Sequence, residues 1–187
     1  MATRVNKYHL PLEIPVAFKF PDYPVPNTQR HYHARFHKAD MTDEFKGWLN
    51  LRGLYVIAGE YFYTPPGQTL EPHSDSSQIS DVVKLNWMQG GEGSTMDWYE
   101  LKPGAALKKN ITSIHTLYSY ASPEDLEHVH SATIGSPSLV NVGRIHAVHN
   151  GNSPRYVACV VLGDGETKQR LEWDKAEKIF GDCIVLT

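Results

Sequence analysis

Short runs of β-branched and aromatic residues recur along the middle of the chain, and this recurrence limits the fold more than any other feature. Val, Ile, Tyr, Phe and Trp fill the runs, while Gly, Pro, Asn and Ser separate them, which is typical of short antiparallel strands. The pattern predicts eight strands, at about residues 55–63, 68–75, 81–88, 95–101, 113–120, 128–134, 138–149 and 155–162. Eight short strands without long helices between them predict a mainly β fold, either a β-sandwich or a jelly roll.

The two ends of the chain differ from this pattern. Five prolines between residues 11 and 26 predict an extended N-terminal arm that is laid over the domain. The stretch "ADMTDEFKGWLNLRG" then predicts a short amphipathic helix, capped by Asp40 or Thr42 and ended by Gly53. A further short helix is predicted at "SPEDLEH", a last helix at "EWDKAEKIF" and a tail strand at "CIVLT".

The length of 187 residues favours a single domain, 1–187. We divide it into an arm and helix (1–53), a strand-rich core (54–163) and a C-terminal helix with a tail (164–187). The net charge of −3 is small and shows no basic stripe, so we expect no nucleic-acid partner. No apolar run has the length of a membrane span, and the N-terminus lacks the apolar core of a signal peptide. We therefore expect a cytoplasmic protein without a membrane partner.

The strongest local motif is "PPGQTLEPHSDSS", which places His73 and Asp75 two residues apart. On a strand, this spacing points both side chains to one face, where an imidazole and a carboxylate can share one metal ion. An isolated H-x-D also fits a hydrogen bond on a surface turn, so the metal hypothesis needs a third ligand.

A second motif, "GRIHAVHNGNSPR", supplies a candidate for that ligand. A strand that ends at His149, followed by a turn at Asn150 and Gly151, predicts a hairpin. In this hairpin His146 and Arg155 lie on the same face, while His149 points to the other face or into the turn. We therefore predict His146 as the third ligand.

Two histidines and one carboxylate leave three positions open on a metal, which is the ligand set of non-haem Fe(II) oxygenases. Such an iron needs a co-substrate that chelates it, and 2-oxoglutarate does so through its 2-oxo group and the adjacent carboxylate. The other carboxylate of 2-oxoglutarate needs a cation, and a guanidinium pairs with a carboxylate through two hydrogen bonds. We predict that Arg155 has this role.

These motifs together resemble a known family. H-x-D, a distal His and an Arg nine residues later resemble the 2-oxoglutarate/Fe(II)-dependent dioxygenases over residues 54–163. The phrase "HAVHNGNSPRYVACVVL" is similar to the end of the double-stranded β-helix in the aspartyl/asparaginyl and prolyl hydroxylase branches. The resemblance implies a double-stranded β-helix, or jelly roll, with a few short flanking helices. It also implies a hydroxylase that uses Fe(II), 2-oxoglutarate and O2, and it leaves the prime substrate open.

The resemblance implies further ligands of the co-substrate. The stretch "YFYTPPGQTLEPHSD" resembles the family's strand that leads to H-x-D, in which a tyrosine helps to hold the co-substrate. Tyr63 matches this position, or Tyr61 if the extra proline shifts the match. Lys84 and Asn86 share one face of the next strand and are also candidates, and Ser138 is a further one.

Two other functions stay open. Gly67 stands six residues before His73, and "GRIHAVHN" has the spacing Gly-x-x-His-x-x-x-Asn, and both resemble cupin motifs. The chain departs from that pattern at Asp75, where a cupin usually has a second histidine, and at Asn141, where it has a proline. A cupin-type metal-dependent dioxygenase or isomerase is the alternative, and a non-catalytic jelly-roll binding module is the third hypothesis. The segments "HYHARFH" and "EHVH" have no predicted role.

Overall fold

A computed structural model of the chain describes residues 6–15, 31–36, 40–112, 115–135 and 137–185. Its strands are β1 (His9–Pro11), β2 (Tyr32–Phe36), β3 (Leu54–Thr64), β4 (Thr69–Ser74), β5 (Val83–Gly90), β6 (Thr95–Leu101), β7 (Lys108–Ile111), β8 (Leu117–Tyr120), β9 (Leu126–Ala132), β10 (Ser138–Asn141), β11 (Ile145–His149) and β12 (Arg155–Asp164). Its helices are α1 (Asp43–Leu51) and α2 (Trp173–Ile179), with short 3-10 turns η2 (Pro123–Asp125) and η3 (Gly181–Cys183).

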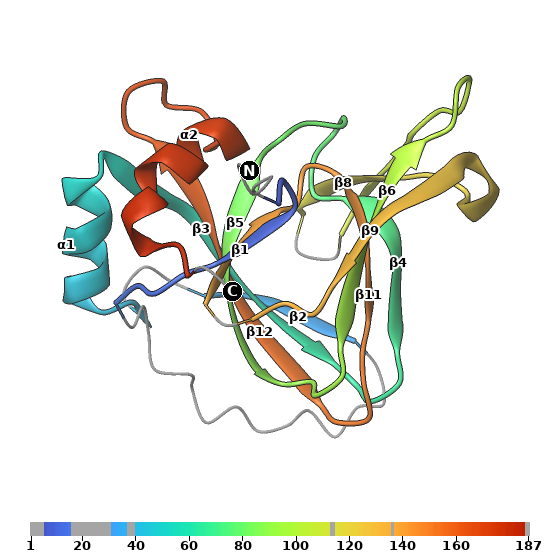
Figure 1. Cartoon of the computed structure of the whole chain (residues 1–187), viewed down its shortest axis with the longest axis horizontal. Helices are drawn as coiled ribbons and strands as arrows, with labels where there is room; N and C mark the ends of the chain where they lie inside the picture. Colours follow the sequence, from blue (N-terminus) through green and yellow to red (C-terminus); the bar gives the residue numbers. More distant parts are fainter. Residues whose placement is uncertain (1–5, 16–30, 37–39, 113–114, 136, 186–187) are drawn as a thin grey trace, which may run out of the picture.

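The strands form two six-stranded antiparallel sheets that face one another (Figure 1). The first sheet has the order β1-β10-β5-β12-β3-β2, and the second has the order β7-β8-β4-β11-β6-β9. Four strands of each sheet, β10-β5-β12-β3 and β4-β11-β6-β9, have the order of an eight-stranded jelly roll. The prediction of a mainly β jelly roll is confirmed, and β1, β2 and the β7–β8 hairpin extend the sheets at their edges.

The largest apolar cluster lies outside the jelly roll, between the first sheet and the two helices, which Figure 1 shows beside β3 and β5. Val83 and Leu85 of β5 belong to this cluster together with Phe45 of α1. Because side chains alternate along a strand, Lys84 and Asn86 point to the other face of β5, between the sheets. The face of β5 that lies between the sheets therefore carries these two polar side chains.

The predicted end segments agree in part with the structure. Thr42 caps α1, since its Oγ1 accepts a hydrogen bond from the backbone N–H of Phe45 (3.2 Å), and α2 forms as predicted. The predicted helix at "SPEDLEH" is only the 3-10 turn η2. The tail strand is wrong for the residues that the structure describes, because Ile184 makes a single isolated bridge with Leu12. The N-terminal arm contributes β1 and β2, which pair with β10 and β3.

The single strand predicted at residues 138–149 is wrong, because this segment forms β10 and β11 in different sheets. Gly143 lies at the crossing, where a Cβ would come within 2.6 Å of Ser80 Oγ and 2.8 Å of the backbone N of Val82. The apolar residues on both sides of Gly143 hide this break in the sequence. Strand β7 was missed because all of Lys108–Ile111 is exposed and shows no alternation.

The predicted hairpin between His146 and Arg155 is also wrong. Strand β11 belongs to the second sheet and β12 to the first, so the two strands do not pair. His146 lies opposite His73 of β4, and Arg155 lies opposite Thr64 of β3. Both side chains are nevertheless buried.

The side chain of Asn150 holds the turn at which the chain passes from β11 in the second sheet to β12 in the first sheet. Its Nδ2 contacts the carbonyl oxygens of Thr64 (3.0 Å), Pro65 (2.6 Å) and Ser153 (3.0 Å) as a donor. Its Oδ1 accepts a hydrogen bond from Ser94 Oγ (2.7 Å). These hydrogen bonds connect the turn to the β3–β4 and β5–β6 connections. A two-residue hairpin loop that lies in solvent would not make them.

We expect Asn150→Ala to lower the free energy of unfolding by about 2–4 kcal/mol, because it leaves several buried carbonyl groups without a donor. Asn150→Asp should be similarly destabilising, since a carboxylate cannot donate to these carbonyls. Urea unfolding measures both effects. The matched control is Asn152→Ala, which changes an exposed residue of the same turn, and equal stability of the two alanine variants would contradict the role of Asn150.

Candidate metal centre

His73, Asp75 and His146 come together between the sheets. His73 lies in β4 and His146 lies opposite it in β11, while Asp75 directly follows the end of β4. One ligand atom from each of the three side chains lies within 4.8 Å of the others. Nε2 of His73 is 3.5 Å from Oδ1 of Asp75, and the two imidazole rings have centroids 4.5 Å apart. This arrangement can hold one metal ion.

Backbone carbonyls orient both imidazoles. Nδ1 of His73 lies 2.7 Å from the carbonyl oxygen of Glu71, and Nδ1 of His146 lies 2.9 Å from that of Arg144. A carbonyl can only accept, so each Nδ1 carries the proton when the ring is neutral. The lone pair is then on Nε2, as a metal ligand requires.

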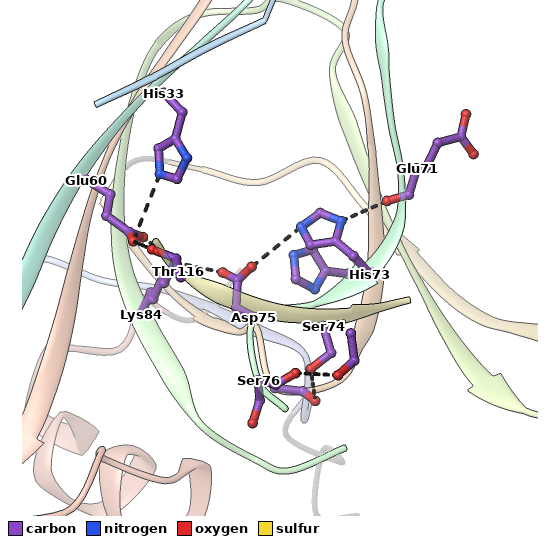
Figure 2. Close-up of polar contacts among 12 residues, drawn as sticks. His33, Glu60, Glu71, His73, Ser74, Asp75, Ser76, Lys84 and Thr116 are labelled. Atoms are coloured by element: carbon purple, nitrogen blue, oxygen red, sulfur yellow. Dashed lines mark hydrogen bonds and ion pairs between the residues drawn. The ribbon is translucent and has the colours of Figure 1, made fainter. Parts of the chain in front are cut away.

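The carboxylate of Asp75 is held from its other side by Lys84, as Figure 2 shows. Oδ2 of Asp75 is 2.7 Å from Nζ of Lys84, which is buried and also lies 2.5 Å from Oε2 of Glu60. Burial disfavours the ammonium, but the two carboxylates outweigh burial and raise the pKa of Lys84 above its ordinary value. Lys84 therefore leaves Oδ1 of Asp75 as the oxygen that faces the histidines.

The ligand set is largely in the protonation states that bind a metal. Burial disfavours the carboxylate of Asp75, but Lys84 and then His73 hold its pKa well below the ordinary value. Burial and the neighbouring His73 lower the pKa of His146 to about 4. For His73, burial is outweighed by the hydrogen bond to Asp75, which raises its pKa. Asp75 is thus ionised and His146 neutral near pH 7, and metal binding requires the neutral form of His73 as well.

Arg155 is buried in the same interior. Its Nε donates to Sδ of Met88 (3.3 Å), and no carboxylate in the described part of the chain forms a salt bridge with it. Burial lowers the pKa of Arg155 to about 10. The guanidinium is still charged near pH 7, so the fold contains a buried cation that an anionic ligand can satisfy.

The other predicted co-substrate ligands lie in different environments. Tyr61 and Tyr63 alternate with Glu60 and Phe62 along β3 and therefore face away from the interior. Tyr61 belongs to the outer apolar cluster, and Tyr63 packs its ring 5.1 Å from that of Tyr156. Neither tyrosine is in position to touch a ligand between the sheets, which corrects that expectation.

Asn86 and Ser138 lie opposite each other on β5 and β10, on the face that carries Lys84. Oδ1 of Asn86 and Oγ of Ser138 are both buried, and neither has a hydrogen-bond partner among the described residues. Lys84 is already paired with two carboxylates, so it is not available to a carboxylate of the co-substrate. The roles of Asn86 and Ser138 as ligands of the co-substrate stay predictions.

A cavity of about 730 Å³ opens at the candidate metal ligands His73 and Asp75. Its walls include residues that the sequence did not identify, above all Glu60, Phe62 and Thr116. A lone acid in the apolar run "VIAGEYFY" is the signal that could have revealed Glu60. His31 and His33 of "HYHARFH" also line the cavity, whereas His37 lies outside the described residues.

The other histidines of the sequence motifs lie elsewhere. His149 points to the outer face of the second sheet, as predicted, with its side chain 42% exposed and Nε2 2.9 Å from Oδ2 of Asp97. His128 contacts Ser131 on the same outer face. His130 stacks on Tyr8 with ring centroids 4.8 Å apart. None of the three histidines approaches the metal ligands.

No protein-family model and no curated protein matches the sequence. The solved structures that match include peruvianin-I, a cysteine peptidase from Thevetia peruviana latex (12% identity, TM-score 0.34, covering 78% of this chain and 68% of that one). They also include oxalate oxidase in complex with glycolate (15% identity, TM-score 0.33, 79% and 57%) and a cupin 2 domain-containing protein from Halorhodospira halophila (12% identity, TM-score 0.30, 89% and 88%). The chain thus spans little more than half the length of oxalate oxidase. These values are too low to transfer an activity. In the described ranges no helix is both long and apolar enough to cross a membrane.

Proposed function

We propose that this protein is an Fe(II)- and 2-oxoglutarate-dependent oxygenase that hydroxylates a C–H bond of its substrate. The single observation that carries the proposal is a buried guanidinium, Arg155, that has no carboxylate partner among the described residues and lies in the same interior as a His-Asp-His triad. A buried arginine alone also occurs in structural roles, and a His-Asp-His triad alone also fits a cupin-type enzyme. Together they fit a ligand that chelates a metal at one end and carries a second carboxylate at the other end.

The residues present fit both groups. His73, Asp75 and His146 would hold the iron and leave positions open for other ligands. Arg155 would hold the far carboxylate of 2-oxoglutarate, which would relieve the cost of its unpaired burial. With both groups bound, the chemistry supplied is the decarboxylation of 2-oxoglutarate to succinate by O2, coupled to the transfer of one oxygen atom to the substrate.

The chain itself contributes binding, orientation and the exclusion of water. The carbonyls of Glu71 and Arg144 fix the imidazoles, and Lys84 fixes the carboxylate of Asp75. Lys84 and His146 are buried, which strengthens their interactions because the effective dielectric constant between the sheets is lower than in water. No general base or nucleophile is needed for this reaction, which agrees with the absence of a Ser-His-Asp or Cys-His motif in the sequence.

One observation favours a second candidate. Arg155 is not among the residues that line the cavity at the triad. A cupin-type metal-dependent enzyme, which uses the triad without 2-oxoglutarate, would not need Arg155 to be reached from this cavity. It is therefore the alternative.

Turnover of 2-oxoglutarate separates the two candidates. The purified protein is loaded anaerobically with Fe(II), mixed with 2-oxoglutarate and air-saturated buffer, and assayed for succinate. We expect slow succinate formation even without the prime substrate. Stoichiometric binding of metal without any succinate, and without binding of 2-oxoglutarate, would exclude the proposed function and favour the cupin-type enzyme.

Lys84 gives a further prediction about the metal ligands. The double change Lys84→Met with Glu60→Gln removes one positive and one negative charge, so the local net charge is preserved. Asp75 then loses the partner that orients it, and we expect the affinity for Mn(II) to fall about 10–100-fold. Electron paramagnetic resonance of free Mn(II) measures this affinity.

The matched control is Lys175→Met with Glu166→Gln, which removes an exposed ion pair (2.9 Å) far along the chain from the ligands. This control should bind Mn(II) like the parent protein. A folded Lys84/Glu60 double variant with the parent's affinity would show that Lys84 does not orient Asp75.

A further inference from the structure

Glu60 links the metal ligands to the opposite wall of the cavity, as Figure 2 shows. Its Oε2 is bound to Lys84, and its Oε1 accepts a hydrogen bond from Oγ1 of Thr116 (3.2 Å). Nε2 of His33 points at the same Oε1 from 3.9 Å, which is too far for a hydrogen bond. Oε1 of Glu60 can therefore accept one more hydrogen bond.

His33 has an unused polar atom at this point. Its Nε2 is buried and has no hydrogen-bond partner among the described residues, and its side chain is only 11% exposed. The ring is held by stacking on Phe62, with centroids 4.2 Å apart and planes 18° apart. Burial lowers the pKa of His33, so its imidazole is neutral near pH 7. A neutral imidazole can donate one hydrogen bond to a ligand.

The charges around Glu60 decide which group fits between these atoms. A cation is disfavoured, because Lys84 already lies against Glu60 and a metal ion would add positive charge nearby. An anion is disfavoured by the carboxylate of Glu60, and Lys84 is the only lysine or arginine among the cavity-lining residues described. The remaining choice is a neutral group that donates to Glu60 and accepts from His33. A hydroxyl group does both.

We propose that His33, Glu60 and Thr116 form a subsite for a neutral hydroxyl group, and that the substrate is an alcohol. Apolar surface of Phe62, Leu70 and Pro72 lines the same cavity, so the carbon skeleton next to the hydroxyl is apolar. That this alcohol is the substrate rests on the proposed function, whereas its binding does not depend on 2-oxoglutarate.

The test uses four probes with one skeleton: benzyl alcohol, benzylamine, benzoate and toluene. Each is titrated into the Mn(II)-loaded protein without 2-oxoglutarate, and the paramagnetic relaxation of its protons reports binding near the metal. We expect benzyl alcohol to bind about 10-fold or more tightly than toluene, as for a hydrogen bond to a charged group. It should also bind more tightly than benzylamine and benzoate.

Two variants and a control locate the subsite. His33→Phe keeps a ring against Phe62 and should reduce the affinity for benzyl alcohol to that for toluene. Thr116→Val, which places a methyl group beside Glu60, should also weaken the binding of benzyl alcohol. This variant tests the subsite if His33→Phe does not fold. His31→Phe, which changes another cavity-lining histidine, should keep the preference.

Several results would overturn the subsite: no binding of benzyl alcohol, equal binding of toluene, tighter binding of benzylamine or benzoate, or an unchanged preference in folded His33→Phe. A protein that takes up no Mn(II) would contradict the metal centre instead. Saturation-transfer measurements with the same four probes would then test the subsite without a metal. If no succinate forms, the proposed function fails. The titrations with the four probes still test the preference for a hydroxyl group.

Discussion

Alanine in place of His73, Asp75 or His146 is expected to lower the affinity for Fe(II) or Mn(II) at least about 100-fold. Changes to residues that only orient a ligand already cost about 10–100-fold, and loss of a ligand itself should cost at least as much. Succinate formation should fall below detection in each variant, including the slow reaction without a prime substrate. Mn(II) titration followed by paramagnetic resonance measures the affinity without any turnover.

His149→Ala is the matched control for His146→Ala. Both histidines lie in β11, but His149 contacts Asp97 on the outer face of the second sheet. The control variant should keep the metal affinity and most of the activity of the parent protein. Metal retained in His146→Ala but lost in His149→Ala would show that the ion binds on the outer face, and the candidate centre would be wrong.

Arg155→Met is expected to remove the binding of 2-oxoglutarate while leaving the binding of metal intact. Loss of a buried partner of a carboxylate costs about 2–5 kcal/mol, which corresponds to about 30-fold to several thousandfold in affinity. The same change should raise the stability of the ligand-free protein by about 1 kcal/mol or more, because methionine replaces a buried charge that has no carboxylate partner in the described part of the chain. Arg155→Lys should give an intermediate affinity, since an ammonium cannot pair bidentately.

Thermal unfolding with and without 2-oxoglutarate and Mn(II) measures both effects in one experiment. The parent should be stabilised by 2-oxoglutarate, whereas Arg155→Met should start from a higher melting temperature and show no such increase. The control is Arg52→Met, which removes a partner of Asp182 (2.7 Å) beside α1. A ligand-free Arg155→Met protein that is clearly less stable than the parent, and that still binds 2-oxoglutarate, would mean that Arg155 has a structural role.

The strands and the faces of their residues could be predicted from the sequence to a large extent. Seven of the eight predicted strands correspond to single strands of the structure, namely β3, β4, β5, β6, β8, β9 and β12. The alternation of β5 correctly separated Lys84 and Asn86 from the apolar residues of the opposite face. Both results depend on the period of two in a strand, which neighbouring residues along the chain express directly.

The cluster of candidate metal ligands His73, Asp75 and His146 could be predicted from the sequence, although part of the argument for it was wrong. His146 was chosen from a hairpin with Arg155 that does not form, since β11 pairs with β4 and β6 instead. The alternation along β11 still separates His146 from His149, whichever strand lies beside it. The face on which a residue lies can therefore be predicted correctly even when the pairing of its strand is predicted wrongly.

The sequence by itself determined the strand-rich fold and the chemical character of each strand face. Only the tertiary structure decided which faces meet: that Glu60 and Thr116 join Lys84 at Asp75, and that Arg155 has no carboxylate beside it among the described residues. Glu60 and Lys84 are 24 residues apart, and Glu60 and Thr116 are 56 apart. Such contacts depend on how strands are ordered in two sheets. That order is set by turns such as Asn150 and by burial of the whole chain, which a local pattern of residues does not contain.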